Sequence, residues 1–120
     1  MLLSVIIPAH GREELLVRCL RSLDNPLQGE MEYEVCVVDD GSGLDEERAR
    51  EKVNASYPLA WLAFPSHRGR SAARNQGVRF TSGKIAVFLD SDMEAQKGFL
   101  RAHRDAHQAN PRTAIAGKIL

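Results

Sequence analysis

Residues 33–43 read Tyr-Glu-Val-Cys-Val-Val-Asp-Asp-Gly-Ser-Gly, and their pattern is repeated elsewhere in the chain. The segment begins as an apolar, β-branched run, which is typical of a strand buried in a sheet. It then ends abruptly on two acids and a glycine-containing turn. Residues 85–92, Ile-Ala-Val-Phe-Leu-Asp-Ser-Asp, follow the same pattern. Both segments therefore predict buried strands that end at acidic turns.

Strands and helices alternate on either side of these segments. Strands are predicted at 2–7, 33–38, 60–64, 85–89 and 113–120. Helices are predicted at 12–23, 45–56, 71–80 and 97–109, with Ser71 as the N-cap of its helix. This alternation is typical of an α/β domain with a mainly parallel sheet. We expect a doubly wound, Rossmann-like sheet with strand order 3-2-1-4 plus a fifth strand.

Composition narrows the class of protein. The chain has 120 residues, enough for one domain, and its 43% hydrophobic and 27% charged content excludes intrinsic disorder. The 16 basic and 16 acidic residues balance, so we expect no nucleic-acid partner. Two cysteines do not support a disulfide scaffold, and no segment is predicted to cross a membrane. A cytoplasmic location is the expectation.

Unusual residues follow three of the predicted strands. Pro8, Ala9 and His10 follow the first, Asp39 and Asp40 the second, and Asp90 and Asp92 the fourth. The carboxyl ends of parallel strands share one edge of a sheet, where ligands bind. Several carboxylates there can hold a divalent cation that bridges to phosphate oxygens. Arginines at 68, 70 and 74, and a helix N-terminus near Ser71, suit a phosphate or a base.

Each motif also has a simpler explanation. Asp-Asp-Gly-Ser alone is more often a turn, and Asp-Ser-Asp is a common tripeptide. His103 and His107 are four residues apart, but a partly exposed helix face explains them better than a zinc site. Only the placement of every acidic turn after an apolar strand favours a binding site.

Taken in order, the motifs resemble the inverting family 2 glycosyltransferases of the glycosyltransferase A fold. The matching segments are Ser-Val-Ile-Ile-Pro-Ala-His at 4–10, the helix at 16–23, Val-Val-Asp-Asp-Gly-Ser at 37–42, Gly-Arg-Ser-Ala-Ala-Arg-Asn-Gln-Gly at 69–77 and Gly-Lys-Ile-Ala-Val-Phe-Leu-Asp-Ser-Asp at 83–92. The resemblance implies transfer of a sugar, with inversion, from a UDP-, GDP- or dTDP-linked donor to an acceptor, with Mn²⁺ or Mg²⁺ as cofactor. The sequence does not identify the acceptor.

The resemblance also implies a role for each matching residue. The residues expected to bind the nucleotide sugar are Pro8, Ala9, His10, Asp39, Asp40, Arg70, Arg74, Asn75, Asp90 and Ser91. Among them, Asp40 would contact the edge of the base, with Asp39 as its structural neighbour. Arg74 and Asn75 would lie near the diphosphate. Asp90 would contact the ribose or the donor sugar, and Asp90 and Asp92 would bind the metal ion.

The chain departs from the family pattern at some positions. Gly11 stands where the family often has Asn, and Met93-Glu94 follow Asp92 where many members have another Asp. The acceptor half and its general base would follow this point, so no catalytic residue is assigned. Residues 1–120 are therefore expected to be the nucleotide-sugar-binding half of a truncated domain, inactive alone. An unpaired sheet edge would then favour self-association.

Other classes of protein remain as alternatives. A phosphoacceptor receiver domain has a similar size and architecture, but it needs an acidic pair after its first strand, where this chain has Pro-Ala-His. A nucleotidyltransferase would need a glycine-rich basic loop there, which Gly11-Arg12 resembles only faintly. A non-catalytic nucleotide- or phosphate-binding α/β module is the third alternative.

Overall fold

Four parallel strands form a sheet in the order β3-β2-β1-β4, which confirms the predicted order. The structure is a computed structural model and describes residues 3–24, 32–96 and 98–109. Its elements are β1 (Leu3–Ala9), α1 (Glu13–Ser22), β2 (Tyr33–Asp39), α2 (Glu46–Val53), β3 (Leu59–Ala63), α3 (Arg70–Phe80), β4 (Ile85–Phe88) and α4 (Phe99–Ala109). The predicted fifth strand at 113–120 lies outside the described residues.

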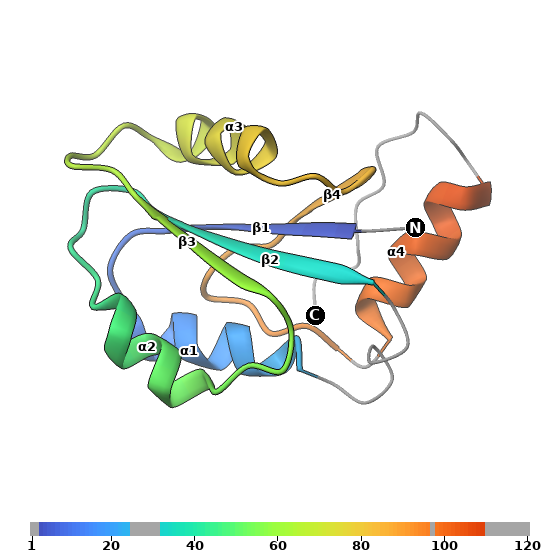
Figure 1. The fold of residues 1–120 in the computed structure, drawn as a ribbon, viewed down its shortest axis with the longest axis horizontal. Coiled ribbons are helices and arrows are strands. Elements are labelled where there is room, and N and C mark those ends of the chain that lie inside the picture. Colours follow the sequence, from blue (N-terminus) through green and yellow to red (C-terminus); the bar gives the residue numbers. More distant parts are fainter. Residues whose placement is uncertain (1–2, 25–31, 97, 110–120) are drawn as a thin grey trace.

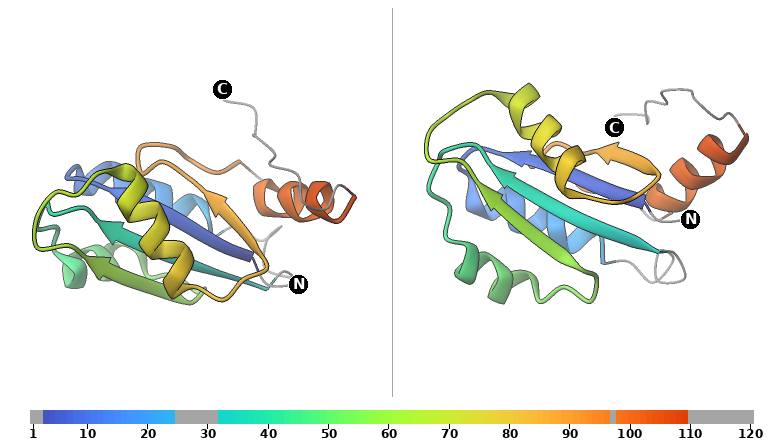
Figure 2. Two further views of the ribbon diagram at one scale, coloured as in Figure 1. Left: turned by 90° about the horizontal axis from the view of Figure 1, so that it is seen from above. Right: turned by 45° about the horizontal axis from the view of Figure 1, so that its top comes forward.

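Helices cover both faces of the sheet. In Figure 1, α3 lies above the strands and α1 and α2 lie below them, and Figure 2 shows the same three layers from two further directions. The face toward α1 holds the larger hydrophobic cluster, which includes Val5, Ile7, Leu16, Leu20 and Val37. Each of these five side chains is fully buried. The burial of β1 and β2 on both faces explains their continuous apolar sequence.

Strand β1 runs two residues further than predicted and includes Pro8. Pairing between β1 and β4 stops at Ile6 and Phe88, with one further hydrogen bond from Leu89 to Ile6. Pro8 therefore lies beyond the β4 ladder, in a part of the strand where a residue without an N–H is tolerated. The strand was expected to end before Pro8. It instead continues to Ala9, which lies at the carboxyl edge of the sheet.

Helix α3 begins one residue earlier than predicted, and its cap was predicted wrongly. Gly69, not Ser71, is the N-cap residue, with a φ of +100°, and Ser71 lies inside the first turn. Glycine is suited to this backbone conformation because it has no Cβ. The cap-forming tendency of serine is therefore overridden by the backbone of the preceding glycine.

The two cysteines, Cys19 and Cys36, are free and buried, in agreement with the prediction of no disulfide scaffold. No helix in the described part of the chain is both long and apolar enough to cross a bilayer. Strand β4 is the outermost described strand on its side of the sheet. Association of two chains through that edge stays a prediction.

Helix α3 packs closely on β1 through a glycine. A Cβ added at Gly77 would lie 2.5 Å from Cγ2 of Ile6, which is fully buried. The absent side chain lets the helix backbone approach the centre of the sheet. This contact sets the distance between α3 and the strands.

We therefore predict that Gly77→Ala lowers the free energy of unfolding by about 1–3 kcal/mol, because the new methyl group overpacks against Ile6. Helix propensity alone would raise stability by about 1 kcal/mol, so the sign of the change is diagnostic. Urea unfolding measures it. Val78→Ala, at an exposed position of the same helix, is the matched control and should not lower stability.

Candidate functional site

Asp39, the last residue of β2, is 1% exposed, and its carboxylate is used entirely within its own loop. It accepts hydrogen bonds from the backbone N–H and hydroxyl of Ser42 and from the N–H of Leu44. Ser42 in turn accepts from the N–H of Gly11, at 2.8 Å. Asp39 thus fixes the turn after β2 and, through Ser42, the loop after β1.

Asp40 is 3% exposed and links the loops that follow different strands. Its Oδ1 accepts from the N–H of Arg68 at 2.7 Å, and its Oδ2 accepts from the N–H of Gly69 at 3.0 Å. Its own N–H donates to the carbonyl of Ala9 at the end of β1. Hydrogen bonds to a carboxylate are about twice as strong as neutral ones. Asp40 therefore joins the ends of β1 and β2 to the start of α3.

Two histidines lie against Asp40. His10 Nδ1 is 3.0 Å from the main-chain oxygen of Asp40, and His67 Nδ1 is 2.9 Å from its Oδ2. The centroids of the two imidazole rings are 4.8 Å apart. Both histidines are exposed, so this group opens to solvent above a buried carboxylate.

Gly41 explains how the loops after β2 and β3 come so close. Its φ is +77°, and a Cβ there would lie 2.2 Å from the carbonyl carbon of Ser66 and 2.3 Å from the backbone nitrogen of His67. Only glycine fits both the conformation and the close approach. The glycine of the Asp-Asp-Gly-Ser turn is therefore what allows His67 to reach Asp40.

Asp90 and Asp92 lie across β1 from Asp40, after β4. The N–H of Met93 donates to the carbonyl of Asp90 at 3.1 Å, so the segment is a turn rather than a continued strand. Residues two apart share a side only in an extended chain, so strand alternation does not by itself place the Asp90 and Asp92 side chains together. The Asp90 side chain is 41% exposed, and Asp92 is exposed with no partner among the described residues. Both carboxylates are accessible to a ligand.

Arg74 extends from α3 toward Asp90. One guanidinium nitrogen is 3.9 Å from Asp90 Oδ1, and the guanidinium carbon is 5.6 Å from the centre of the Phe88 ring. Arg74 Nε is buried and has no hydrogen-bond partner within the described part of the chain. A buried donor without a partner costs free energy and is available to an incoming acceptor. The arginine therefore suits an anion held beside Asp90.

The remaining predicted residues are spread along the same edge. Pro8 is partly buried and Ala9 is buried at the end of β1, Arg70 and Asn75 are exposed on α3, and Ser91 lies in the turn between the two acids. Arg68 is directed elsewhere, with its guanidinium 4.7 Å from the Phe64 ring centre. Glu94 faces Arg18 of α1 at 3.5 Å and takes no part in the site.

The sequence prediction omitted His67. It follows β3, which is the neighbour of β2 in the sheet, so the rule that carboxyl ends share one edge could have found it. The prediction also offered the backbone N–H groups at the start of α3 to a bound anion. In the structure, the N–H of Gly69 is already bonded to Asp40.

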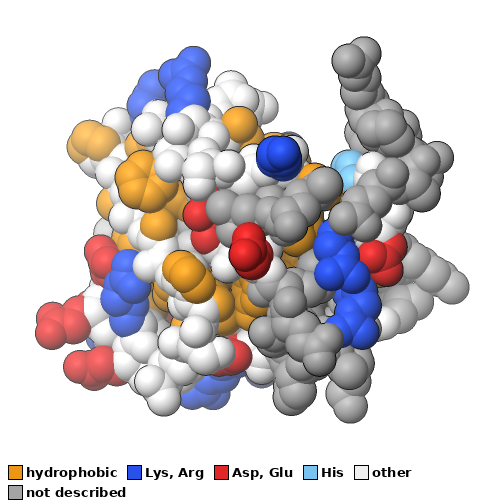
Figure 3. Space-filling model, turned by 45° about the vertical axis from the view of Figure 1, so that its right-hand side comes forward, with side chains coloured by type: hydrophobic (Ala, Val, Ile, Leu, Met, Phe, Trp, Pro, Cys, Tyr) orange, Lys and Arg blue, Asp and Glu red, His pale blue; other side chains and the backbone are white. Residues whose placement is uncertain are grey.

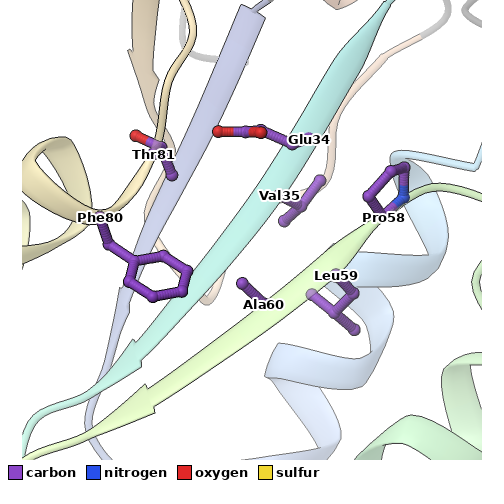
Figure 4. Close-up of a pocket in the computed structure, with 7 residues that line it drawn as sticks. All are labelled: Glu34, Val35, Pro58, Leu59, Ala60, Phe80 and Thr81. Carbon is purple, nitrogen blue, oxygen red and sulfur yellow. The ribbon is translucent and has the colours of Figure 1, made fainter.

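A shallow hollow of about 190 Å³ lies at the other end of the sheet. Figure 4 shows Phe80 of α3 facing Val35, Leu59 and Ala60 there, with Pro58 and Glu34 at the sides. Val35 and Leu59 are near the amino ends of β2 and β3. At about 3.3 Å per residue, they lie roughly 13 Å along the strands from the Asp39 level of the sheet. The hollow is therefore separate from the candidate site.

The surface seen in Figure 3, where the right-hand side of Figure 1 is turned forward, has acidic, basic and hydrophobic side chains interspersed.

Known proteins share this chain's sequence pattern. The family model described as Glycosyl transferase family 2 matches residues 4–120. The chain belongs to this family. It is 37% identical over 114 residues to the uncharacterized glycosyltransferase YfnE of Bacillus subtilis, and 33% identical over 94 residues to the dolichol-phosphate mannosyltransferase of Pyrococcus furiosus. These matches cover 95% and 78% of this chain but only 29% and 26% of the relatives. The chain thus spans less than a third of either.

Solved structures give the same result for the fold. The structure of S. aureus TarS 1-349 in complex with UDP-GlcNAc is 25% identical with a TM-score of 0.72, and the match covers 97% of this chain and 37% of that TarS 1-349 chain. The mannosyltransferase PcManGT of Pyrobaculum calidifontis, in complex with GDP-Man and Mn²⁺, has a TM-score of 0.76 at 24% identity, covering 91% and 32%. The α/β fold with order 3-2-1-4 and the resemblance to family 2 glycosyltransferases are confirmed. The receiver-like alternative is not favoured.

We predict that Asp40→Asn lowers the free energy of unfolding by about 1–3 kcal/mol, because an amide nitrogen would face one of the backbone donors that the carboxylate now satisfies. Urea unfolding measures the change, and amide exchange should quicken at Arg68 and Gly69. Asp92→Asn, at an exposed acid that has no partner among residues 3–24, 32–96 and 98–109, is the control and should leave stability unchanged. Equal effects of the two substitutions would contradict the role given to Asp40.

Burial raises the pKa of the Cys19 thiol from 9.0 to about 12, with the Asp92 and Asp90 carboxylates adding to the shift. Burial likewise raises the pKa of Cys36 to about 11. Both thiols should stay protonated at pH 8 and react slowly with a thiol reagent until urea unfolds the chain. Because the unfolded thiols ionise near pH 9, their contribution to stability is complete below that pH and is lost as pH rises toward 12. Fast labelling of the native chain would contradict this.

Proposed function

We propose that this chain binds the nucleotide-sugar donor of an inverting glycosyltransferase at the carboxyl edge of its sheet. The observation that carries the proposal is the arrangement at this edge. Asp40 joins the loops after β1, β2 and β3. The side chains of Asp90, Asp92 and Arg74 lie on the other side of β1 and are accessible to a ligand. The base would lie on the Asp40 side and the diphosphate on the Arg74 side. UDP-, GDP- and dTDP-linked sugars are the candidate donors.

Two features of the chain support a phosphate near Asp90. Arg74 has a buried Nε without a partner among the described residues, and its guanidinium is already close to Asp90. A phosphate oxygen could accept from this donor. The TarS structures with UDP and with UDP-GlcNAc support a nucleotide-sugar donor for the family.

Asp90 and Asp92 fit a divalent cation, because both carboxylates are accessible and oxygen ligands suit Mn²⁺ and Mg²⁺. When bound, such an ion supplies positive charge that stabilises the leaving nucleoside diphosphate. The PcManGT complex with GDP-Man and Mn²⁺ supports this proposal. Arg74 would orient the diphosphate and share its charge, and the buried Asp40 carboxylate would orient the base through a base N–H.

The chain would thus supply the donor-binding part of the transferase. Inversion requires that an acceptor hydroxyl attack the sugar from the side opposite the leaving diphosphate, after a base removes its proton. The acids of the site have other parts in this proposal: Asp39 and Asp40 hold the loops and the base, and Asp90 and Asp92 hold the metal ion. We propose that the general base and the acceptor contacts come from outside these 120 residues.

Calorimetric titration with UDP, GDP and dTDP, first with Mn²⁺ and then with a chelator, tests the proposal. We expect at least one nucleotide to bind, and the chelator to weaken binding by about 10-fold or more, on the order of 1.4 kcal/mol. Asp92→Ala should have the same effect as the chelator. Asp105→Ala removes another exposed carboxylate, on α4, and should change nothing.

Two outcomes would count against this proposal. Nucleotide binding that needs no metal and is unchanged in Asp92→Ala would contradict the metal assignment. Failure of all three nucleotides to bind would contradict the donor role and favour a non-catalytic module of the same fold.

A further inference from the structure

Asp40 orients two imidazole rings as well as two loops. Its main-chain oxygen contacts His10 Nδ1 at 3.0 Å, and its carboxylate Oδ2 contacts His67 Nδ1 at 2.9 Å. The rings approach each other with centroids 4.8 Å apart and an interplanar angle of 59°. The two histidines lie in the loops after β1 and β3 and are 57 residues apart in the sequence. The fold has therefore brought together two nitrogen ligands and a carboxylate.

The contact with the main chain determines the tautomer of neutral His10. A carbonyl oxygen only accepts hydrogen bonds, so Nδ1 of His10 must carry the proton. Its Nε2 then holds the lone pair. Histidines that bind metals commonly donate their other ring N–H to a carbonyl or carboxylate in this way. His10 is thus held in a form that can bind a metal ion.

The spacing of the ligand atoms is close to what a metal ion needs. One potential ligand atom from each of His10, Asp40 and His67 lies within 4.8 Å of the other two. Bonds of about 2.0–2.2 Å in a tetrahedral zinc site place neighbouring ligand atoms roughly 3.3–3.5 Å apart. The His67 side chain is 63% exposed, so its ring has room to reorient toward a bound ion. The Asp40 carboxylate stays fixed by Arg68 and Gly69.

We propose that His10, Asp40 and His67 bind a transition metal ion of the zinc type. Two imidazoles and one carboxylate suit Zn²⁺, whereas Mg²⁺ prefers oxygen ligands alone. Water would complete the coordination. This site is separate from the one proposed at Asp90 and Asp92, which offers carboxylates and no imidazole.

The site has a consequence that rests on the proposed function. Asp40 is the residue proposed to contact the base of the donor. A zinc ion bound there would occupy the same carboxylate and reduce access to the base pocket. Zn²⁺ would therefore compete with the nucleotide, while Mn²⁺ at Asp90 and Asp92 would assist it.

Calorimetric titration of the metal-free chain with ZnCl₂ tests the metal site without any nucleotide. We expect saturable binding of one zinc ion and a loss of zinc affinity of at least about 10-fold in His10→Ala and in His67→Ala. Any binding of Mg²⁺, which is proposed at Asp90 and Asp92, should be unchanged in both variants. His10→Gln and His67→Gln, which keep a polar side chain, should show the same loss. Both histidines are exposed, and circular dichroism with a thermal melt checks that each variant folds.

His107→Ala is the matched control, because it removes a histidine from α4, away from Asp40. Zinc affinity should be unchanged in this variant. Loss of affinity in His107→Ala but not in His67→Ala would place the ion on α4 and overturn the proposal. Absence of saturable binding, or affinity that does not respond to either His10 or His67, would also overturn it.

A second titration separates this inference from the proposed function. With Mn²⁺ present, added Zn²⁺ should raise the nucleotide Kd in the parent chain but not in His67→Ala. Zinc binding with no effect on the nucleotide would contradict the placement of the base at Asp40 and leave the metal site supported. If no nucleotide binds, the proposed function fails, while the first titration still decides the zinc site.

Discussion

A buried carboxylate must be compensated by nearby donors, and the arrangement at the carboxyl edge of this sheet follows from how Asp40 is compensated. Its two oxygens take the backbone N–H groups of Arg68 and Gly69, and His67 adds a third contact. Those partners follow β3, whereas Asp40 follows β2 and its own N–H bonds to β1. This single carboxylate group and its backbone N–H therefore align the ends of three strands and the start of α3.

The neighbouring acid serves a different purpose. The Asp39 carboxylate accepts hydrogen bonds from Ser42 and Leu44, inside its own turn. The loop after β2 is therefore held in place before any ligand binds. Across β1 the situation is reversed, because Asp90 and Asp92 are accessible and Arg74 keeps an unpaired buried Nε in the described structure. The edge thus has two different sides. Around Asp39 and Asp40 the hydrogen bonds are already made, whereas the polar groups of Asp90, Asp92 and Arg74 can still bind a ligand.

Much of this could be predicted from local pattern. Apolar runs alternating with helical spacing indicate a doubly wound parallel sheet, for which the order 3-2-1-4 is expected, and the acidic turns indicate the edge where the site lies. The errors concern contacts between distant residues. Ser71 has the right chemistry for a cap, but Gly69 takes that place and bonds to Asp40, 29 positions away. His67 has no distinctive local motif, and the turn at Asp90 depends on a hydrogen bond that strand alternation does not reveal.

The contact between Gly77 and Ile6 also bears on motion. A helix backbone seated this closely on a buried side chain has no room to slide along or tilt against the sheet. Helix α3 therefore keeps a fixed position relative to the sheet, and so does the backbone of Arg74, which is part of this helix. Adjustment to a bound molecule would fall on the exposed side chains of residues 65–68, whose backbone is held by Asp40, and on the turn at 90–93. Selectivity among ligands would then reside in loop sequence, while the helix and strands could stay the same.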